Sequence, residues 1–244
     1  MANKILIIFF ALTLFSCSNQ FNERKKPIIV FTFDDENHTI YDIAFPIMKE
    51  YDFKGTLVVN TGIVNNYPHI LTWDQIYEMV FENGWETAGH TLHHIDLVTS
   101  PKPLIHKEIY LDWLNLKNRG LPHETFALPA GHANDYAFSQ IEKYYKNIRT
   151  SIDLNLKMPI DRKMLGYFFY QTDFDYQDVI ERINDAVIAQ DDVLILGFHR
   201  FENTNNNSVD FCKPDDFRKI VQYVFKNRFQ VMTIKDMCNK LISY

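Results

Sequence analysis

Residues 28–35 read Ile-Ile-Val-Phe-Thr-Phe-Asp-Asp, an apolar run that ends in two acids. The first six residues are all β-branched or aromatic, and such side chains favour extended backbone. The run therefore predicts a buried strand. Asp34 and Asp35 follow it directly, so the sequence places two carboxylates at the carboxyl end of the first strand.

Outward from this run, strand and helix patterns alternate along the chain. The predicted strands are residues 27–33, 55–60, 84–89, 124–128, 147–151, 165–171, 192–198 and 229–233. The predicted helices are residues 40–51, 72–83, 103–119, 135–145, 176–189, 214–226 and 235–242. Such alternation predicts an α/β protein with parallel strands joined by right-handed crossovers. Seven or eight units fit either a distorted barrel or a doubly wound open sheet.

Length and composition fit one large domain. The chain has 244 residues and is 46% hydrophobic, which suffices for a single α/β core. We assign residues 27–244 to this domain. The net charge is -6 and no basic run occurs, so nucleic acid is excluded as the main partner. Composition does not indicate the oligomeric state.

The N-terminus has the pattern of an export signal. Lys4 precedes an apolar stretch at residues 5–15, which is too short to span a membrane. Residues 14–17, Leu-Phe-Ser-Cys, resemble a bacterial lipobox, in which Cys17 is acylated. We therefore predict a lipoprotein signal peptide at residues 1–16 and a tether at residues 17–26. The protein would be exported and lipid-anchored to a bacterial membrane, on its periplasmic or cell-surface side; an ordinary cleaved signal is the alternative.

Two cysteines remain in the predicted mature chain, Cys212 and Cys238. An exported compartment permits a disulfide between them, but cysteine is also a frequent small core residue. The sequence leaves their pairing open.

Two closely spaced histidines follow the third predicted strand. His90 and His94 are four residues apart, and the carboxyl ends of barrel strands converge on one rim, where active sites lie. With the acids after the first strand, they offer two imidazoles and one carboxylate to a divalent metal and leave the second carboxylate free. A metal with three protein ligands keeps an open position for water or substrate. The pattern therefore indicates metal-assisted hydrolysis.

Four segments resemble motifs of the polysaccharide deacetylase (NodB-homology) family of carbohydrate esterases. Residues 31–35 match the first motif, Thr-Phe-Asp-Asp-Gly, up to its last residue, and residues 90–94 match the second, His-(Ser/Thr)-x-x-His. Residues 126–131 look like a degraded third motif, Arg-x-Pro-Tyr, and residues 194–199 are similar to the late Leu-x-His motif. The resemblance spans essentially all of residues 27–240. It implies a distorted (β/α) barrel of about seven parallel strands.

The resemblance also implies an activity, a cofactor and a role for each matching residue. The chain would be a metal-dependent enzyme that removes acetyl groups from an N- or O-acetylated glycan. One divalent metal, commonly zinc, would be bound by Asp35, His90 and His94. Asp34 would be the general base, the backbone N–H of Ala130 would donate to the oxyanion, and His199 would be the general acid. An imidazole suits this last role because its pKa is about 6.5.

Several positions depart from the family pattern. Ala127 stands in place of the arginine that orients the catalytic aspartate, and we expect Arg200 to supply the missing positive charge. Asp175 is the best match for the acid that partners the catalytic histidine. Glu36 stands where the family has glycine; we expect it to face solvent, with a role as a metal ligand as the alternative.

Two other functions remain compatible with the sequence. The first is a glycan-binding member of the same fold with weak catalysis, because the third motif has decayed. The second is a non-haem iron oxygenase, because two histidines and one carboxylate also make that site. An acid–base pair formed by Asp34 and His199 favours hydrolysis over oxygenation.

Overall fold

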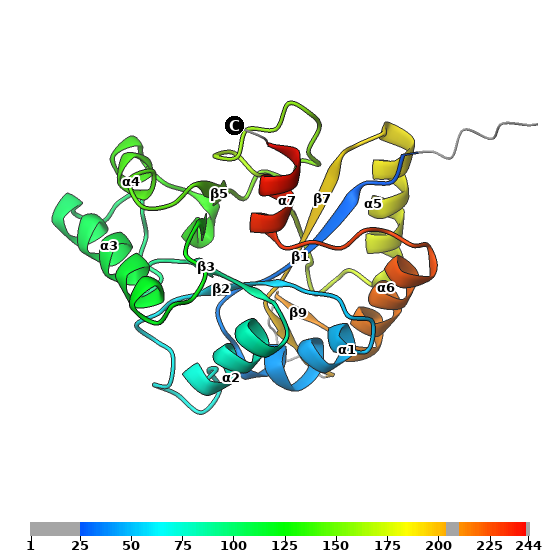
Figure 1. Cartoon of the computed structure of the whole chain (residues 1–244), viewed down its shortest axis with the longest axis horizontal. Coiled ribbons are helices and arrows are strands. Elements are labelled where there is room, and N and C mark those ends of the chain that lie inside the picture. The colour runs from blue at the N-terminus through cyan, green and yellow to red at the C-terminus, as the bar shows by residue number, and fades with distance from the viewer. Residues whose placement is uncertain (1–24, 204–209, 243–244) are drawn as a thin grey trace, which may run out of the picture.

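The computed structural model describes residues 25–203 and 210–242 (Figure 1). The predicted signal peptide, Cys17 and all of the predicted tether before Lys25 lie outside these residues. Within the described ranges, no helix is both long and apolar enough to cross a bilayer.

Seven parallel strands form one sheet, in the order β5-β4-β3-β2-β1-β7-β6. Their bounds are β1 Ile28–Phe33, β2 Thr56–Val59, β3 Glu86–Gly89, β4 Thr125–Ala127, β5 Asn147–Arg149, β6 Phe168–Phe169 and β7 Val193–Phe198. Each contains the middle of a predicted strand. The parallel sheet of seven strands confirms the predicted fold.

A short run before β6 connects the two edges of this sheet. Leu165 exchanges backbone hydrogen bonds with β5, donating to Ile148 and accepting from Thr150. Three residues further on, β6 pairs with β7. The sheet therefore curls into a distorted barrel, as the resemblance implied, and not into an open doubly wound sheet.

Helices cover the outer side of the curled sheet (Figure 1). They are α1 Phe45–Lys49, α2 Trp73–Tyr77, α3 Lys102–Asn118, α4 Asp135–Ile141, α5 Tyr176–Ala189 and α6 Pro214–Lys226. The last helix, α7 Ile234–Leu241, lies at one end of the barrel. Wider π-helical turns at Ile40–Ala44 and Glu78–Glu82 adjoin α1 and α2. Helices α3 and α4 contact each other beside β3, whereas α5 and α6 contact each other beside β7.

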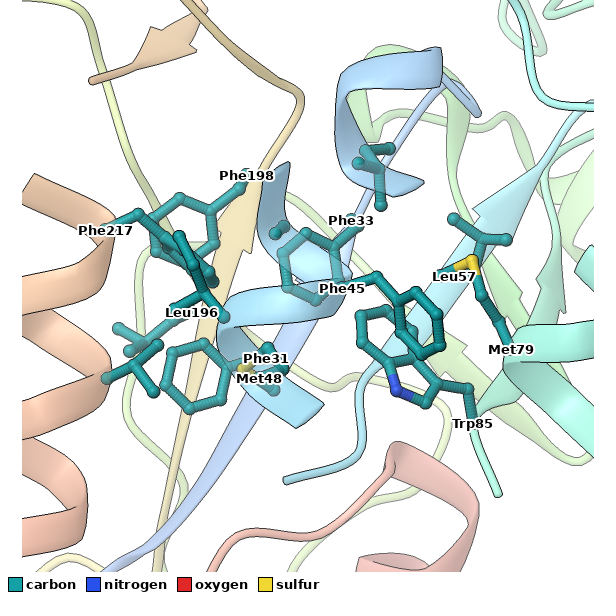
Figure 2. Packing of buried hydrophobic residues seen from close by; sticks show 14 of the residues in the cluster. Phe31, Phe33, Phe45, Met48, Leu57, Met79, Trp85, Leu196, Phe198 and Phe217 are labelled. Carbon is teal, nitrogen blue, oxygen red and sulfur yellow. The ribbon is translucent and has the colours of Figure 1, made fainter. Parts of the chain in front are cut away.

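Alternate residues of β1 face opposite sides of the sheet. Phe31 and Phe33 face outward and pack with Phe198 of β7 against Phe217 of α6, with ring centroids 5.1 to 6.3 Å apart (Figure 2). Their neighbours Val30, Thr32 and Asp34 therefore face the barrel interior. This alternation places Asp34 inside and leaves the aromatic core outside.

The barrel interior combines small and polar side chains. Val58, Ala88 and Ala127 form a fully buried cluster there. At the amino ends of the strands, the buried Glu86 accepts hydrogen bonds from Thr56 and from the backbone N–H of Lys235, at the start of α7. Helix α7 therefore closes the end of the barrel opposite the rim that carries Asp34.

Three small elements differ from the sequence prediction. The strand predicted at residues 229–233 forms only a bridge between Val231 and Ile29. Strands β8 (Arg200–Phe201) and β9 (Phe211–Cys212) pair with each other and were not predicted.

Both cysteines are buried and free, so the structure contains no disulfide between Cys212 and Cys238.

Candidate active site

Four predicted site residues meet at the carboxyl ends of the strands. Asp35 follows β1, His90 and His94 follow β3, and His199 follows β7. One carboxylate oxygen of Asp35 lies 3.5 Å from Nε2 of His90 and 3.7 Å from Nε2 of His94. The other oxygen lies 3.9 Å from Nε2 of His199.

The ligand atoms of Asp35, His90 and His94 fit a divalent metal. All of them lie within 4.8 Å of one another. Two ligands bound tetrahedrally to zinc at about 2.0–2.1 Å lie about 3.4 Å apart, close to the two separations from Asp35. Moreover, Oδ1 of Asp35 is buried and has no hydrogen-bond partner among the described residues. A cation at this point would satisfy it.

His90 is prepared to act as a ligand through Nε2. Its Nδ1 lies 2.8 Å from the carbonyl oxygen of Ala127, to which it donates. This hydrogen bond places the proton on Nδ1 and leaves the lone pair on Nε2, which faces Asp35. Burial lowers the pKa of His90 to about 4, so the ring is neutral at pH 7 and able to bind a metal.

Asp34 is buried and ion-paired beside this cluster. The guanidinium of Arg149 donates to Oδ2 of Asp34 at 2.5 Å, and both side chains are almost fully buried. Burial is the largest single effect and raises the pKa of Asp34. The charge of Arg149, its hydrogen bond and the nearby His199 and His90 together lower that pKa by more, so it lies below the ordinary value. Asp34 is therefore a carboxylate at neutral pH. Its Oδ1 has no hydrogen-bond partner in the described part of the chain.

Arg149 explains how the chain dispenses with an arginine at position 127. Ala127 of β4 and Arg149 of β5 are paired partners in the parallel register. Arg149 therefore lies on the neighbouring strand, directly beside Ala127. Its long side chain reaches Asp34 across the small side chain of Ala127. The guanidinium also lies over the ring of Tyr167, 4.1 Å from the centroid.

The prediction that Arg200 supplies this charge was wrong. Arg200 forms ion pairs with Asp210 and Glu202. Arg149 was not among the predicted site residues because it belongs to no motif. An arginine inside a buried strand was a usable signal, since arginine is almost never fully buried without a partner.

His199 lies close to both acids but is not partnered by Asp175. Its Nε2 is 4.0 Å from Oδ2 of Asp34, and its ring packs edge-on against Phe169 at 4.8 Å. Its Nδ1 is buried and without a hydrogen-bond partner among residues 25–203 and 210–242. Asp175 instead caps α5, accepting from the backbone N–H of Gln177. The proposed support of His199 by Asp175 is therefore not found.

Two further site predictions have different outcomes. Ala130 is exposed and has a left-handed backbone, with φ 50° and ψ 11° in the turn Pro129–Gly131. Its role toward an oxyanion stays a prediction. Glu36 does not face solvent as expected, because its side chain is buried and accepts a hydrogen bond from the backbone N–H of Asn60. It is also not part of the cluster of possible metal ligands.

Two hollows adjoin the site on the same rim. One of about 210 Å³ lies between the ends of β5 and β6, with Tyr167, Phe168, Phe169 and Phe174 in its wall. The other, of about 420 Å³, lies beside the turn after β4, with Leu128 and Gly131 in its wall. Ser151 lines both. The two hollows are therefore neighbours, and the smaller one reaches the site through Phe169, which contacts His199.

Comparison with known proteins agrees with this fold. The sequence profile described as "Polysaccharide deacetylase" matches residues 21–146, and the chain belongs to this family. The matched region contains Asp34, Asp35, His90 and His94 but ends before Arg149.

One curated relative is the poly-beta-1,6-N-acetyl-D-glucosamine N-deacetylase of Staphylococcus aureus, 30% identical over 135 residues. That match covers 48% of this chain and 45% of the relative. The chain thus matches less than half the length of the curated relatives.

Solved structures share the fold. The Xyl-CE4 domain of a multidomain xylanase, from the hindgut metagenome of Trinervitermes trinervoides, has a TM-score of 0.62 at 19% identity and covers 88% of this chain and 91% of that domain. BA3943 of Bacillus anthracis, described as a CE4 family pseudoenzyme, has a TM-score of 0.55 at 13% identity, covering 88% of this chain and 66% of that one.

Proposed function

We propose that this protein is a metal-dependent hydrolase that removes acetyl groups from a glycan. One observation carries the proposal: a buried, ionised Asp34, neutralised by Arg149, lies beside three side chains that fit a divalent metal. A carboxylate with an unbonded oxygen at such a position is suited to remove a proton from an attacking water.

A divalent metal such as zinc, bound by Asp35, His90 and His94, would polarise the acetyl carbonyl and lower the pKa of water. Asp34 accepts the proton of that water through its unbonded Oδ1. Arg149 keeps Asp34 ionised and fixes its orientation. The backbone N–H of Ala130 donates to the oxygen that becomes negative, because such donors stabilise charge as it develops. His199 protonates the departing amine or alcohol.

The aromatic hollow supports a sugar substrate. Phe168, Phe169 and Phe174 line a space of about 210 Å³ next to His199. Aromatic faces pack well against apolar C–H groups, and a pyranose ring presents such groups on its faces. A volume below the usual range for drug-sized ligands suits one sugar unit.

A glycan-binding protein without catalysis is the competing function. It is favoured by Ala127, which replaces the family arginine, and by the similarity of the fold to a pseudoenzyme. The ion pair between Arg149 and Asp34 favours the enzyme, because the catalytic aspartate keeps its counter-charge.

Acetate release separates the two functions. The protein is incubated with N-acetylated chito-oligomers and with O-acetylated xylan, and free acetate is measured. We expect release that stops on chelation of divalent metals and returns when zinc is restored. Glycan binding without any release would favour the competing function, and the two substrates distinguish amide from ester cleavage.

We also propose that the enzyme is exported from the cytoplasm. The pattern Leu-Phe-Ser-Cys at residues 14–17 supports lipid attachment at Cys17. A lipid-bearing Cys17 would keep the catalytic domain at the membrane surface, where an exported glycan is accessible.

A further inference from the structure

The two loops that carry the possible metal ligands have strained backbones. Positive φ angles occur at Asp35 (68°), Glu36 (33°), Thr91 (65°) and His94 (56°). Residues with a Cβ atom rarely adopt this conformation, and it persists where surrounding contacts enforce it. Contacts outside the ligand set must therefore hold both loops.

Glu36 connects these two loops through Asn60. The side chain of Glu36 is 1% exposed, and its Oε2 accepts the backbone N–H of Asn60 at 2.7 Å. The side-chain amide of Asn60 donates to the carbonyl oxygen of His90 at 2.6 Å. A displacement of Glu36 would therefore be transmitted to the backbone of a metal-binding histidine.

Asp112 holds the same segment from the other side. This residue of α3 is fully buried, and its Oδ2 accepts the backbone N–H of His90 at 3.0 Å. Its Oδ1 accepts the backbone N–H of Thr61 at 3.2 Å, and Tyr145 donates to Oδ2 at 3.1 Å. A Cβ atom at Gly89 would lie 2.5 Å from Oδ2 of Asp112, so the glycine permits this close approach.

We propose that Glu36 and Asp112 are positioning residues for the metal site. Neither belongs to the cluster of possible ligands, but together they fix both backbone groups of His90, the N–H directly and the carbonyl through Asn60. The inference rests on the metal site of the proposed function and adds the two buried carboxyl groups that keep its strained loops in a binding geometry.

Zinc affinity of the full chain, measured by competition with a chromophoric chelator, tests this proposal without a substrate. We expect Glu36→Ala and Asp112→Ala to weaken zinc binding by about 10–100-fold, the usual effect of removing a residue that supports a ligand. Glu36→Gln should bind zinc within about threefold of wild type, because its amide oxygen can still accept the N–H of Asn60.

Glu86→Ala is the matched control. Glu86 is an equally buried acid on β3, but it lies at the opposite end of the barrel from the metal site. This variant should lower the melting temperature of the metal-free protein and leave zinc affinity within about threefold of wild type.

Three results would overturn the inference. These are wild-type affinity in both Glu36→Ala and Asp112→Ala, equal weakening in Glu36→Gln and Glu36→Ala, or equal weakening in the Glu86→Ala control. Failure of the wild-type protein to bind zinc is a distinct result, since it would also remove the metal site of the proposed function.

Discussion

Asp34→Asn should lower the rate of acetate release by about 10²–10⁴-fold, the usual contribution of a general base. The amide has the shape of the carboxylate but cannot accept a proton from water at neutral pH. Because Asp34 is not among the three possible ligands, zinc affinity should stay within a few-fold of wild type. Acetate release and zinc content are measured on the same sample.

Measuring both acetate release and zinc content of Asp34→Asn distinguishes loss of the general base from loss of the metal site. Loss of zinc together with activity would indicate that Asp34 acts as a ligand. Undiminished acetate release with normal zinc content would contradict its assignment as the base.

Arg149→Met should have the second-largest effect on acetate release, after Asp34→Asn. It leaves the Asp34 carboxylate buried without a counter-charge, which lowers the free energy of unfolding by about 3–5 kcal/mol. Because the charge of Arg149 lowers the pKa of Asp34, its removal should raise that pKa and reduce the ionised fraction of the base. We expect acetate release to fall about tenfold or more, measured together with thermal unfolding.

The paired register of Ala127 and Arg149 provides a rescue experiment. In Ala127→Arg/Arg149→Ala the guanidinium returns to the position that the family uses, and part of the lost activity should recover. The matched control is Arg200→Ala, which removes an arginine that pairs with Asp210 and should leave acetate release within about threefold of wild type. Equal losses in Arg149→Met and Arg200→Ala would contradict the role of Arg149.

Local sequence patterns predicted the parallel sheet and the cluster of Asp35, His90 and His94, whereas the barrel followed from the family resemblance. The first strand and the third each end in a motif, and parallel strands place their carboxyl ends on one rim. The predicted helices at residues 176–189 and 214–226 coincide with α5 and α6, because each has a strong amphipathic pattern. The strand predicted at residues 229–233 forms only a bridge. A short apolar run predicts extended backbone but does not show whether a neighbouring strand lies close enough to pair with it.

The residues that support the site could not be predicted in the same way. Arg149 reaches Asp34 only because β5 pairs with β4 in a register that no local pattern encodes. The burial of Glu36 depends on Asn60, which is distant in sequence. Asp175 was misassigned because an acid in a loop before a helix can equally be a catalytic partner or a helix cap. Asp178 lies three residues after Asp175, and this spacing of two acids at the start of a helix could have indicated a capping box.

Zinc titration of metal-stripped protein during turnover tests the central claim most directly. The protein is freed of divalent metals, and acetate release from an acetylated glycan is followed as zinc is added. We predict no release at the start and a rise that saturates at about one ion per chain, because the three ligands define a single site. His94→Ala should show no such rise. Release by the stripped protein, or equal activation of His94→Ala by zinc, would contradict the account.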